Sequence, residues 1–214
     1  MSITPKGMSV LELYRLYREN NLIVNRRYQR KLVWGKSEKT SLIESILLKY
    51  PIPLILFGKF KKEGMDMYEI IDGMQRLNAI FSFIENQFSV EDKFFDVTQH
   101  PLANELSNQG VFQKINISQD NLLNSQECVD FLEYSLAVTI YEANSEKEIE
   151  DVFNRINSNG KHLSAQEVRQ AGVTNNFAEL VKSLGSEIRG DVSREIIPLT
   201  EMPEISIDYK SIDL

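Results

Sequence analysis

Several residue types are scarce in this chain of 214 residues, and each scarcity excludes a class of protein. The single cysteine, Cys128, cannot form an internal disulfide, which fits a reducing compartment, and its apolar neighbours predict a buried, inert thiol. The two histidines, His100 and His162, stand far apart, so we expect no metal site of the zinc type. No apolar run could span a bilayer and no signal-like segment opens the chain. These absences predict a cytoplasmic protein without a membrane partner.

Positive charge is also scarce: 24 Lys and Arg residues face 31 Asp and Glu residues, for a net charge of −7. A compact domain of this charge is a poor general nucleic-acid binder, because non-specific affinity depends on neutralising phosphates. The charge is nevertheless uneven, since residues 26–39 are strongly basic. The candidate DNA-binding residues are Arg26, Arg27 and Lys31. An ordinary solvated face is the alternative.

The apolar residues, 42% of the chain, follow helix and strand periods in turn, which predicts an α/β protein with one core. Strands are expected at residues 22–24, 53–60, 68–71 and 135–141. Helices are expected to begin after Ser9, at Ser37, at Gln75, after Ser145 and after Ser164. The helix that carries Leu77, Ile80, Phe81 and Ile84 has the spacing of a core face, and we expect it to pack on the sheet that includes Leu54 and Leu56.

Two regions lack a clear period. Residues 88–133 are polar and acidic, and they are interpreted as an insertion that is partly helical near residues 125–133. Periodicity is lost again from Arg194. We therefore expect one domain over residues 1–193 and a C-terminal tail over residues 194–214, which would be the truncated start of a helical region.

A strand that ends at Ile71 runs into Asp72 and Gly73 and then into a helix that carries Gln75 and Arg76. A helix N-terminus attracts anions, a glycine lets the backbone approach a ligand, and a guanidinium suits phosphate. The residues therefore predict a phosphate-binding turn. A plain turn with a surface arginine is the alternative, and Asp72 could equally orient Arg76, bind a metal or cap the helix.

Two further motifs accompany this turn. Tyr28, Gln29 and Arg30 precede Val33 and Trp34, and a later stretch contains Phe153, Asn154, Asn157, Gly160, Leu163, Ser164, Glu167 and Arg169. The order of the three motifs resembles the N-terminal domain family of GmrSD-type, modification-dependent restriction systems. That family looks like a branch of the ParB/sulfiredoxin nucleotide-binding fold. The resemblance covers about residues 8 to 190, and Met74 stands where the family usually has Gln.

The resemblance implies a small mixed sheet flanked by helices (α/β or α+β) and a site for a nucleoside triphosphate with Mg²⁺. The residues that it implies for catalysis are Asp72, Gln75 and Arg76. Those that it implies for nucleotide binding are Gln29, Arg30, Gly73, Asn154 and Asn157. Phosphoryl transfer needs mainly positioning and charge stabilisation, which arginines, amides and a metal can supply.

Three functions follow from this reading. The first is a nucleoside triphosphatase in a bacterial restriction or anti-phage defence protein, which acts on DNA through a nuclease domain or partner chain outside this sequence. The second is a non-catalytic nucleotide- or DNA-binding regulatory module, in which Met74 marks lost hydrolysis. The third, a ParB-like nuclease, is opposed by the lack of clustered acidic ligands or a catalytic histidine in the sequence.

Overall fold

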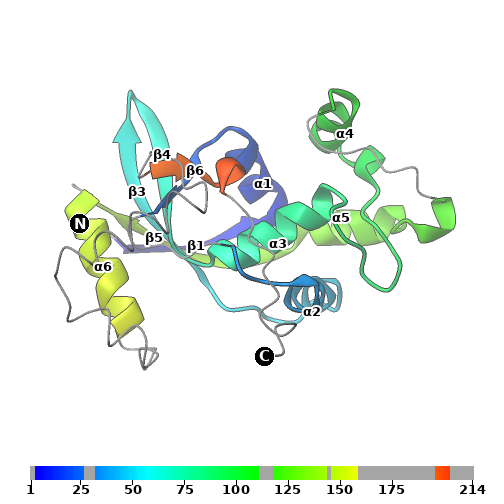
Figure 1. Ribbon diagram of the computed structural model, residues 1–214, viewed down its shortest axis with the longest axis horizontal. Coiled ribbons are helices and arrows are strands. Elements are labelled where there is room, and N and C mark those ends of the chain that lie inside the picture. The colour runs from blue at the N-terminus through cyan, green and yellow to red at the C-terminus, as the bar shows by residue number, and fades with distance from the viewer. Residues whose placement is uncertain (1–2, 27–31, 111–117, 144–145, 159–195, 203–214) are drawn as a thin grey trace, which may run out of the picture.

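The computed structural model describes residues 3–26, 32–110, 118–143, 146–158 and 196–202. These residues form one mixed sheet with helices packed around it (Figure 1), which confirms the predicted α/β class. The strands are β1 (Ile3–Ser9), β2 (Leu22–Asn25), β3 (Ile55–Lys62), β4 (Met65–Asp72), β5 (Ser135–Glu142) and β6 (Ile196–Pro198). The α-helices are α1 (Val10–Arg18), α2 (Lys36–Leu47), α3 (Met74–Ile84), α4 (Pro101–Asn108), α5 (Ser125–Glu133) and α6 (Glu146–Ser158).

The strand order in the sheet is β1-β5-β3-β4-β2-β6. The pairs β3/β5 and β2/β4 are parallel, and the remaining pairs are antiparallel. Because β2 and β4 are parallel, their carboxyl ends at Asn25 and Asp72 lie at the same edge of the sheet, where the antiparallel β3 begins at Ile55. We call this edge the turn edge. It carries the predicted strand–glycine–helix junction.

The two faces of the sheet support separate apolar clusters, because side chains alternate along a strand. Ile55 and Phe57 belong to the larger cluster, together with the α3 residues Leu77, Ile80, Phe81 and Ile84. Leu56 belongs to a smaller cluster on the opposite face with Ile71 and the α6 residue Ile149. The predicted helix face is therefore confirmed, and Phe81 is only 1% exposed.

The expectation that this helix face packs on the sheet that includes Leu56 is confirmed, whereas the inclusion of Leu54 in that sheet is wrong. Leu54 precedes β3 and is 49% exposed, because the strand begins one residue later at Ile55. Leu56 points to the face that α6 covers. A buried apolar run does not reveal which of its residues faces which layer, and here Ile55 and Phe57 face α3 while Leu56 faces α6.

Residues 88–133 contribute to the core in addition to surface structure. Phe88, Phe95 and Phe131 lie around Phe83 of α3, with ring centroids 5.3–6.4 Å from that ring. The region also contains α4, α5 and the short 3-10 helices Val97–Gln99 and Gln119–Asn121. The helix expected near residues 125–133 is confirmed as α5, and α4 and α5 lie at the end of the molecule opposite α6 (Figure 1).

Two other differences concern element ends. The second helix begins at Lys36 with Gly35 as its N-cap, one residue before the expected Ser37. Residues 196–202 fall in the expected tail, yet they form β6 beside β2 and a 3-10 helix, Leu199–Glu201. The expected caps at Ser145 and Ser164 lie outside the described residues. Of the helices in the described part of the chain, none has the length and apolar character needed to cross a membrane.

The burial of Phe81 yields a stability prediction. Phe81→Ala should lower the free energy of unfolding by about 3–5 kcal/mol, because it leaves a cavity between α3 and α1, where Tyr17 stacks on this ring at 4.5 Å. Leu54→Ala is the matched control and should cost less than about 1 kcal/mol, since Leu54 is half exposed. Urea unfolding measures both values. Equal losses would contradict the observed register.

Candidate functional site

The junction between β4 and α3 depends on Gly73. This residue has φ 101° and ψ 7°, a left-handed conformation that glycine adopts readily. A Cβ placed on Gly73 would lie 2.4 Å from Cδ1 of Ile55 and 3.5 Å from its Cα. The backbone of the turn therefore sits directly against the start of β3, and glycine is required by both conformation and space.

Gly73 is also the N-cap of α3, and no side chain caps this helix within the described residues. The first N–H groups of a helix have no partner in the helix itself, so this N-terminus suits an anion. Met74, the first residue of α3, is only 5% exposed and belongs to the larger apolar cluster. The Met74 side chain therefore packs in the core beneath the turn.

Arg76 joins the turn to the chain that precedes β3. Its Nη2 donates to Oδ2 of Asp72 at 2.7 Å, and its Nη1 donates to the backbone carbonyls of Pro53 and of Leu54, the latter at 3.0 Å. The residue is only 9% exposed. A guanidinium that donates to three protein acceptors stabilises the local fold, and a phosphate would have to compete with these acceptors.

Asp72 is the exposed member of this pair, with more than half of its side chain accessible. One carboxylate oxygen accepts from Arg76, and the carboxyl group faces solvent at the turn edge. Among the described residues no group of three or more His, Cys, Asp or Glu side chains could hold a metal ion by itself. Mg²⁺ commonly binds to one or two carboxylates together with substrate phosphates, and a single exposed carboxylate fits that mode.

Gln75 contacts the chain that follows the basic segment. Its Oε1 accepts from the backbone N–H groups of Val33 at 3.0 Å and Trp34 at 3.2 Å. The sequence motif indicated a polar residue at the helix start but gave no sign of this long-range partner. Trp34 itself is half-buried and packs against the larger apolar cluster.

The basic segment is described only at its ends. Arg26 follows β2 directly at the turn edge and is half-buried. The other predicted residues of the segment, which are Arg27, Gln29, Arg30 and Lys31, lie outside the described residues. The parallel pairing of β2 with β4 therefore brings the start of the segment to the same edge as Gly73.

The described part of the third motif lies on α6, which packs on the opposite face of the sheet. The backbone N–H of Ala143 donates to the carbonyl of Lys59. Six residues later, Ile149 packs with Leu56 and Ile71. Ile149 also lies directly against Gly58, so α6 covers the middle of β3 on the face opposite α3. Asn154 is exposed on α6, whereas Asn157 is described only as part of the helix. The described contacts do not join Asn154 to the Gly73 turn, which leaves its predicted role open.

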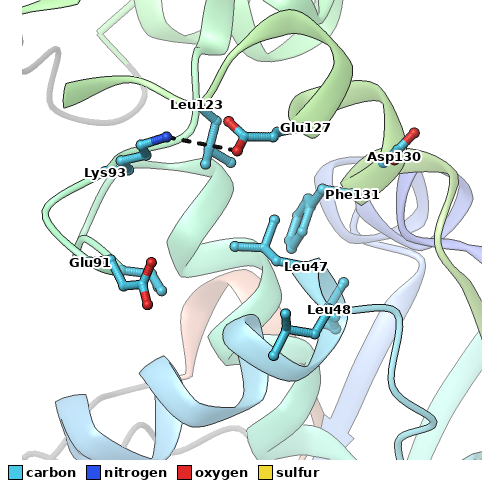
Figure 2. Close-up of a pocket in the computed structure, with 10 residues that line it drawn as sticks. Leu47, Leu48, Glu91, Lys93, Leu123, Glu127, Asp130 and Phe131 are labelled. Atoms are coloured by element: carbon cyan, nitrogen blue, oxygen red, sulfur yellow. Dashed lines mark ion pairs between the residues drawn. The ribbon is translucent and has the colours of Figure 1, made fainter. Parts of the chain in front are cut away.

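A cavity of about 240 Å³ lies elsewhere, and Figure 2 shows Leu47, Leu48 and Phe131 around it. Lys93 and Glu127 form an ion pair at its rim, with 3.7 Å between Nζ and Oε1. The cavity adjoins the carboxyl end of α2, whereas Trp34 and Gln75 meet near the amino end of that helix. Twelve helical residues span roughly 18 Å, so this cavity is separate from the turn.

The remaining candidate groups have structural roles. Cys128 is fully buried, and burial raises the pKa of its thiol to about 11, as expected for an inert cysteine. His100 caps α4, where its Nδ1 accepts from the N–H of Ala103 at 3.2 Å, and burial lowers its pKa. His162 lies outside the described residues.

These observations define a mixed α/β domain in which the Gly73 turn, the end of β2 and the contact of Gln75 with Val33 and Trp34 lie at one edge of the sheet. The profile of the family described as GmrSD restriction endonuclease, N-terminal domain, matches residues 10–174. The chain belongs to this family, which confirms the resemblance seen in its motifs and places the chain in the context of restriction systems. The comparison with curated proteins gave no match.

The close contact at Gly73 generates the second prediction. Gly73→Ala should destabilise the fold by about 2–4 kcal/mol, the sum of a positive φ and a steric clash with Ile55. Gly64→Ala is the matched control, since Gly64 has φ +84° and nothing within 4 Å of an added Cβ. It should cost only about 1 kcal/mol. Urea unfolding measures both.

The double variant Gly73→Ala with Ile55→Val tests the steric part separately. Valine lacks the Cδ1 atom that an added Cβ would approach most closely. The double variant should therefore recover part of the loss, so that the two substitutions are not additive. Additive losses would show that the Ile55 contact does not determine the need for glycine.

Proposed function

We propose that this protein binds a nucleoside triphosphate at the Gly73 turn and hydrolyses it, as part of a modification-dependent restriction or anti-phage defence protein. The family membership supplies the restriction context. The observation that carries the proposal is the start of α3, which opens at a left-handed glycine without a side-chain cap. Such a helix start offers backbone N–H groups and a partial positive charge to a phosphate. The same proposal includes a cytoplasmic location.

The charges that complement a triphosphate come from the flanking motifs in this proposal. Gln29 and Arg30 contribute from the basic segment, which begins next to the turn because β2 and β4 are parallel. Asn154 and Asn157 contribute from α6, which packs on the opposite face of the sheet. The shared edge supports the contribution of the basic segment, and the family membership supports that of α6.

Mg²⁺ would join the nucleotide to Asp72. A carboxylate beside a triphosphate is repulsive unless a cation lies between them. The exposed Asp72 carboxylate and the nucleotide phosphates together provide the oxygen ligands that Mg²⁺ prefers. The metal would neutralise charge that develops during phosphoryl transfer. Arg76 would keep Asp72 in place through the contact at 2.7 Å, so its contribution to catalysis is to hold the carboxylate.

The involvement of Arg76 in the fold favours a second candidate, a module that binds nucleotide or DNA without hydrolysis. Arg76 is only 9% exposed and its guanidinium donates to three protein acceptors, so little of its charge is available to a transferred phosphoryl group. Release of inorganic phosphate from bound nucleotide separates the two candidates. A bound nucleotide that stays intact would favour the regulatory module.

Nucleotide binding gives the third prediction. Isothermal calorimetry with ATP, GTP and CTP should detect binding of at least one of them in the presence of Mg²⁺. Asp72→Asn keeps an oxygen that can accept from Arg76 but removes the negative charge. Without Mg²⁺, this variant should bind nucleotide more tightly than the wild type by about 1 kcal/mol, because one repulsion is lost. With Mg²⁺, it should bind less tightly.

Asp66→Asn is the matched control. Asp66 lies at the hairpin end of β4, where its Oδ2 pairs with Nζ of Lys59 at 2.7 Å. Its nucleotide affinity should match that of the wild type at both Mg²⁺ conditions. Folded wild-type protein that binds none of the three nucleotides would refute the proposal. An Asp72→Asn variant with unchanged Mg²⁺ dependence would refute the role of the carboxylate.

Any direct DNA contact is proposed to use Arg26, Arg27 and Lys31, because the rest of the chain is acidic. Each phosphate contact contributes about −0.9 to the slope of log affinity against log salt. Replacing Arg26 and Arg27 by Ala should flatten that slope by up to about 2 if both contact phosphate. Fluorescence anisotropy of a labelled duplex at several salt concentrations measures the slope.

An unchanged slope with DNA still bound would exclude this segment as the DNA-binding surface. The replacement of Lys61 and Lys62 by Ala is a suitable control, because these residues lie at the exposed hairpin end of the sheet. That variant should keep the wild-type slope. Wild-type protein that does not bind DNA would favour target recognition by another domain or partner.

A further inference from the structure

The side chain of Gln75 makes an unusual double contact at the start of α3. Its Oε1 accepts two backbone N–H groups, from Val33 and Trp34, which are 42 and 41 residues away in the sequence. Two donors on one atom require that atom to be the carboxamide oxygen, with both lone pairs in use. The oxygen is therefore committed to the protein backbone.

Gln75 supplies an acceptor to two N–H groups that secondary structure leaves without one. Val33 and Trp34 belong to neither helix nor strand, between the buried Leu32 and the Gly35 N-cap of α2. A backbone N–H without a partner in secondary structure costs free energy unless a side chain or water supplies one. Gln75 provides that partner for two consecutive residues, and it does so two residues after Gly73.

We infer that Gln75 is a positioning residue that holds Val33 and Trp34 against the first turn of α3 and so completes the wall of the nucleotide site. The inference has two parts, which are the hold on Val33 and Trp34 and the contribution to the nucleotide site. Only the second part rests on the proposed function. It assigns to Gln75 a structural link between two motifs, in place of the catalytic role that the family resemblance implies. Because the link belongs to the same helical turn as the proposed phosphate contacts, nucleotide affinity depends on it.

Two substitutions separate the acceptor from the size of the side chain. Gln75→Met keeps the length of the chain and removes the acceptor, whereas Gln75→Glu keeps an acceptor oxygen. Amide hydrogen exchange by NMR should show the N–H groups of Val33 and Trp34 exchanging on the order of tenfold faster in Gln75→Met. Gln75→Glu should keep the wild-type protection of both amides.

Two internal controls show that the effect is local. The amide of Leu77, which bonds to the Gly73 carbonyl at 3.0 Å, should keep its protection in every variant, since α3 stays folded. Gln109→Met is the matched surface variant, because the side-chain hydrogen bond described for Gln109 joins it to Glu105, four residues earlier. It should leave the amides of Val33 and Trp34 unchanged. Unchanged exchange in Gln75→Met, or equal loss in Gln75→Glu, would overturn the positioning role.

The contribution of Gln75 to nucleotide binding is measured separately, by fluorescence. Trp34 is the only tryptophan, so emission excited selectively from tryptophan reports on this stretch alone. Titration with ATP and Mg²⁺, or with GTP or CTP if calorimetry selects one of these, should change the emission of the wild type. In Gln75→Met the dissociation constant should rise severalfold. An unchanged constant, with the two amides exposed, would overturn the claim that the link serves the nucleotide site.

The outcomes separate the inference from the proposed function. If no nucleotide binds to the wild type but the amides respond to Gln75→Met and not to Gln75→Glu, the proposed function fails and the positioning role stands. If nucleotide binds and the amides do not respond, the positioning role fails and the proposed function stands.

Discussion

The contact between Gly73 and Ile55 determines how α3 leaves the sheet. Because residue 73 has no Cβ and a positive φ, the backbone turns against the first residue of β3 without a steric clash. Arg76 then donates back to Asp72 and to the carbonyls that precede β3. The end of β4, the approach to β3 and the first turn of α3 therefore behave as one rigid unit. Any ligand at this turn meets a preformed backbone, which lowers the ordering cost of binding.

The opposite end of α3 is held in a similar way. Glu85, the C-cap of α3, is buried, and its Oε1 accepts from Nη1 of Arg18 at 3.0 Å. Burial raises the pKa of this carboxyl group, and the Arg18 guanidinium opposes that rise. An arginine–carboxylate pair thus ties each end of the central helix to its surroundings. Between the two pairs, nearly every residue of α3 is buried, so this helix packs against its surroundings along its whole length.

The sequence was sufficient to predict local features with a strong period. The strands near residues 22–24, 68–71 and 135–141 and the buried face of α3 are confirmed because each has a clear apolar repeat. The strand β1 was missed because it is polar and mostly exposed, and β6 was missed because its three residues depend on pairing with β2. Such elements are determined by tertiary contacts, which override local propensity.

The sequence predicted which residue types form the candidate site more successfully than it predicted the contacts that they make. The glycine at the turn was identified correctly from its place between a strand and a helix. The pairing of Asp72 with Arg76 was among the expected alternatives. The backbone partners of Arg76 and Gln75 were not, because they lie 22 to 42 residues away and have no sequence signature of their own. The aromatic residues of region 88–133 were likewise hidden in a polar segment, since Phe95 and Phe131 meet only when the chain is folded.

The outer strands of the sheet have a practical consequence for any shortened form of this protein. The family match covers residues 10–174, whereas β1 ends at Ser9 and β6 begins at Ile196. A fragment trimmed to the matched region would lose both outermost strands and leave β5 and β2 with unpaired backbone groups along the sheet. Newly exposed sheet edges are templates for pairing with other chains. A fragment whose ends follow the family match would therefore favour aggregation. A fragment that retains residues 3–202 would keep both outer strands in place.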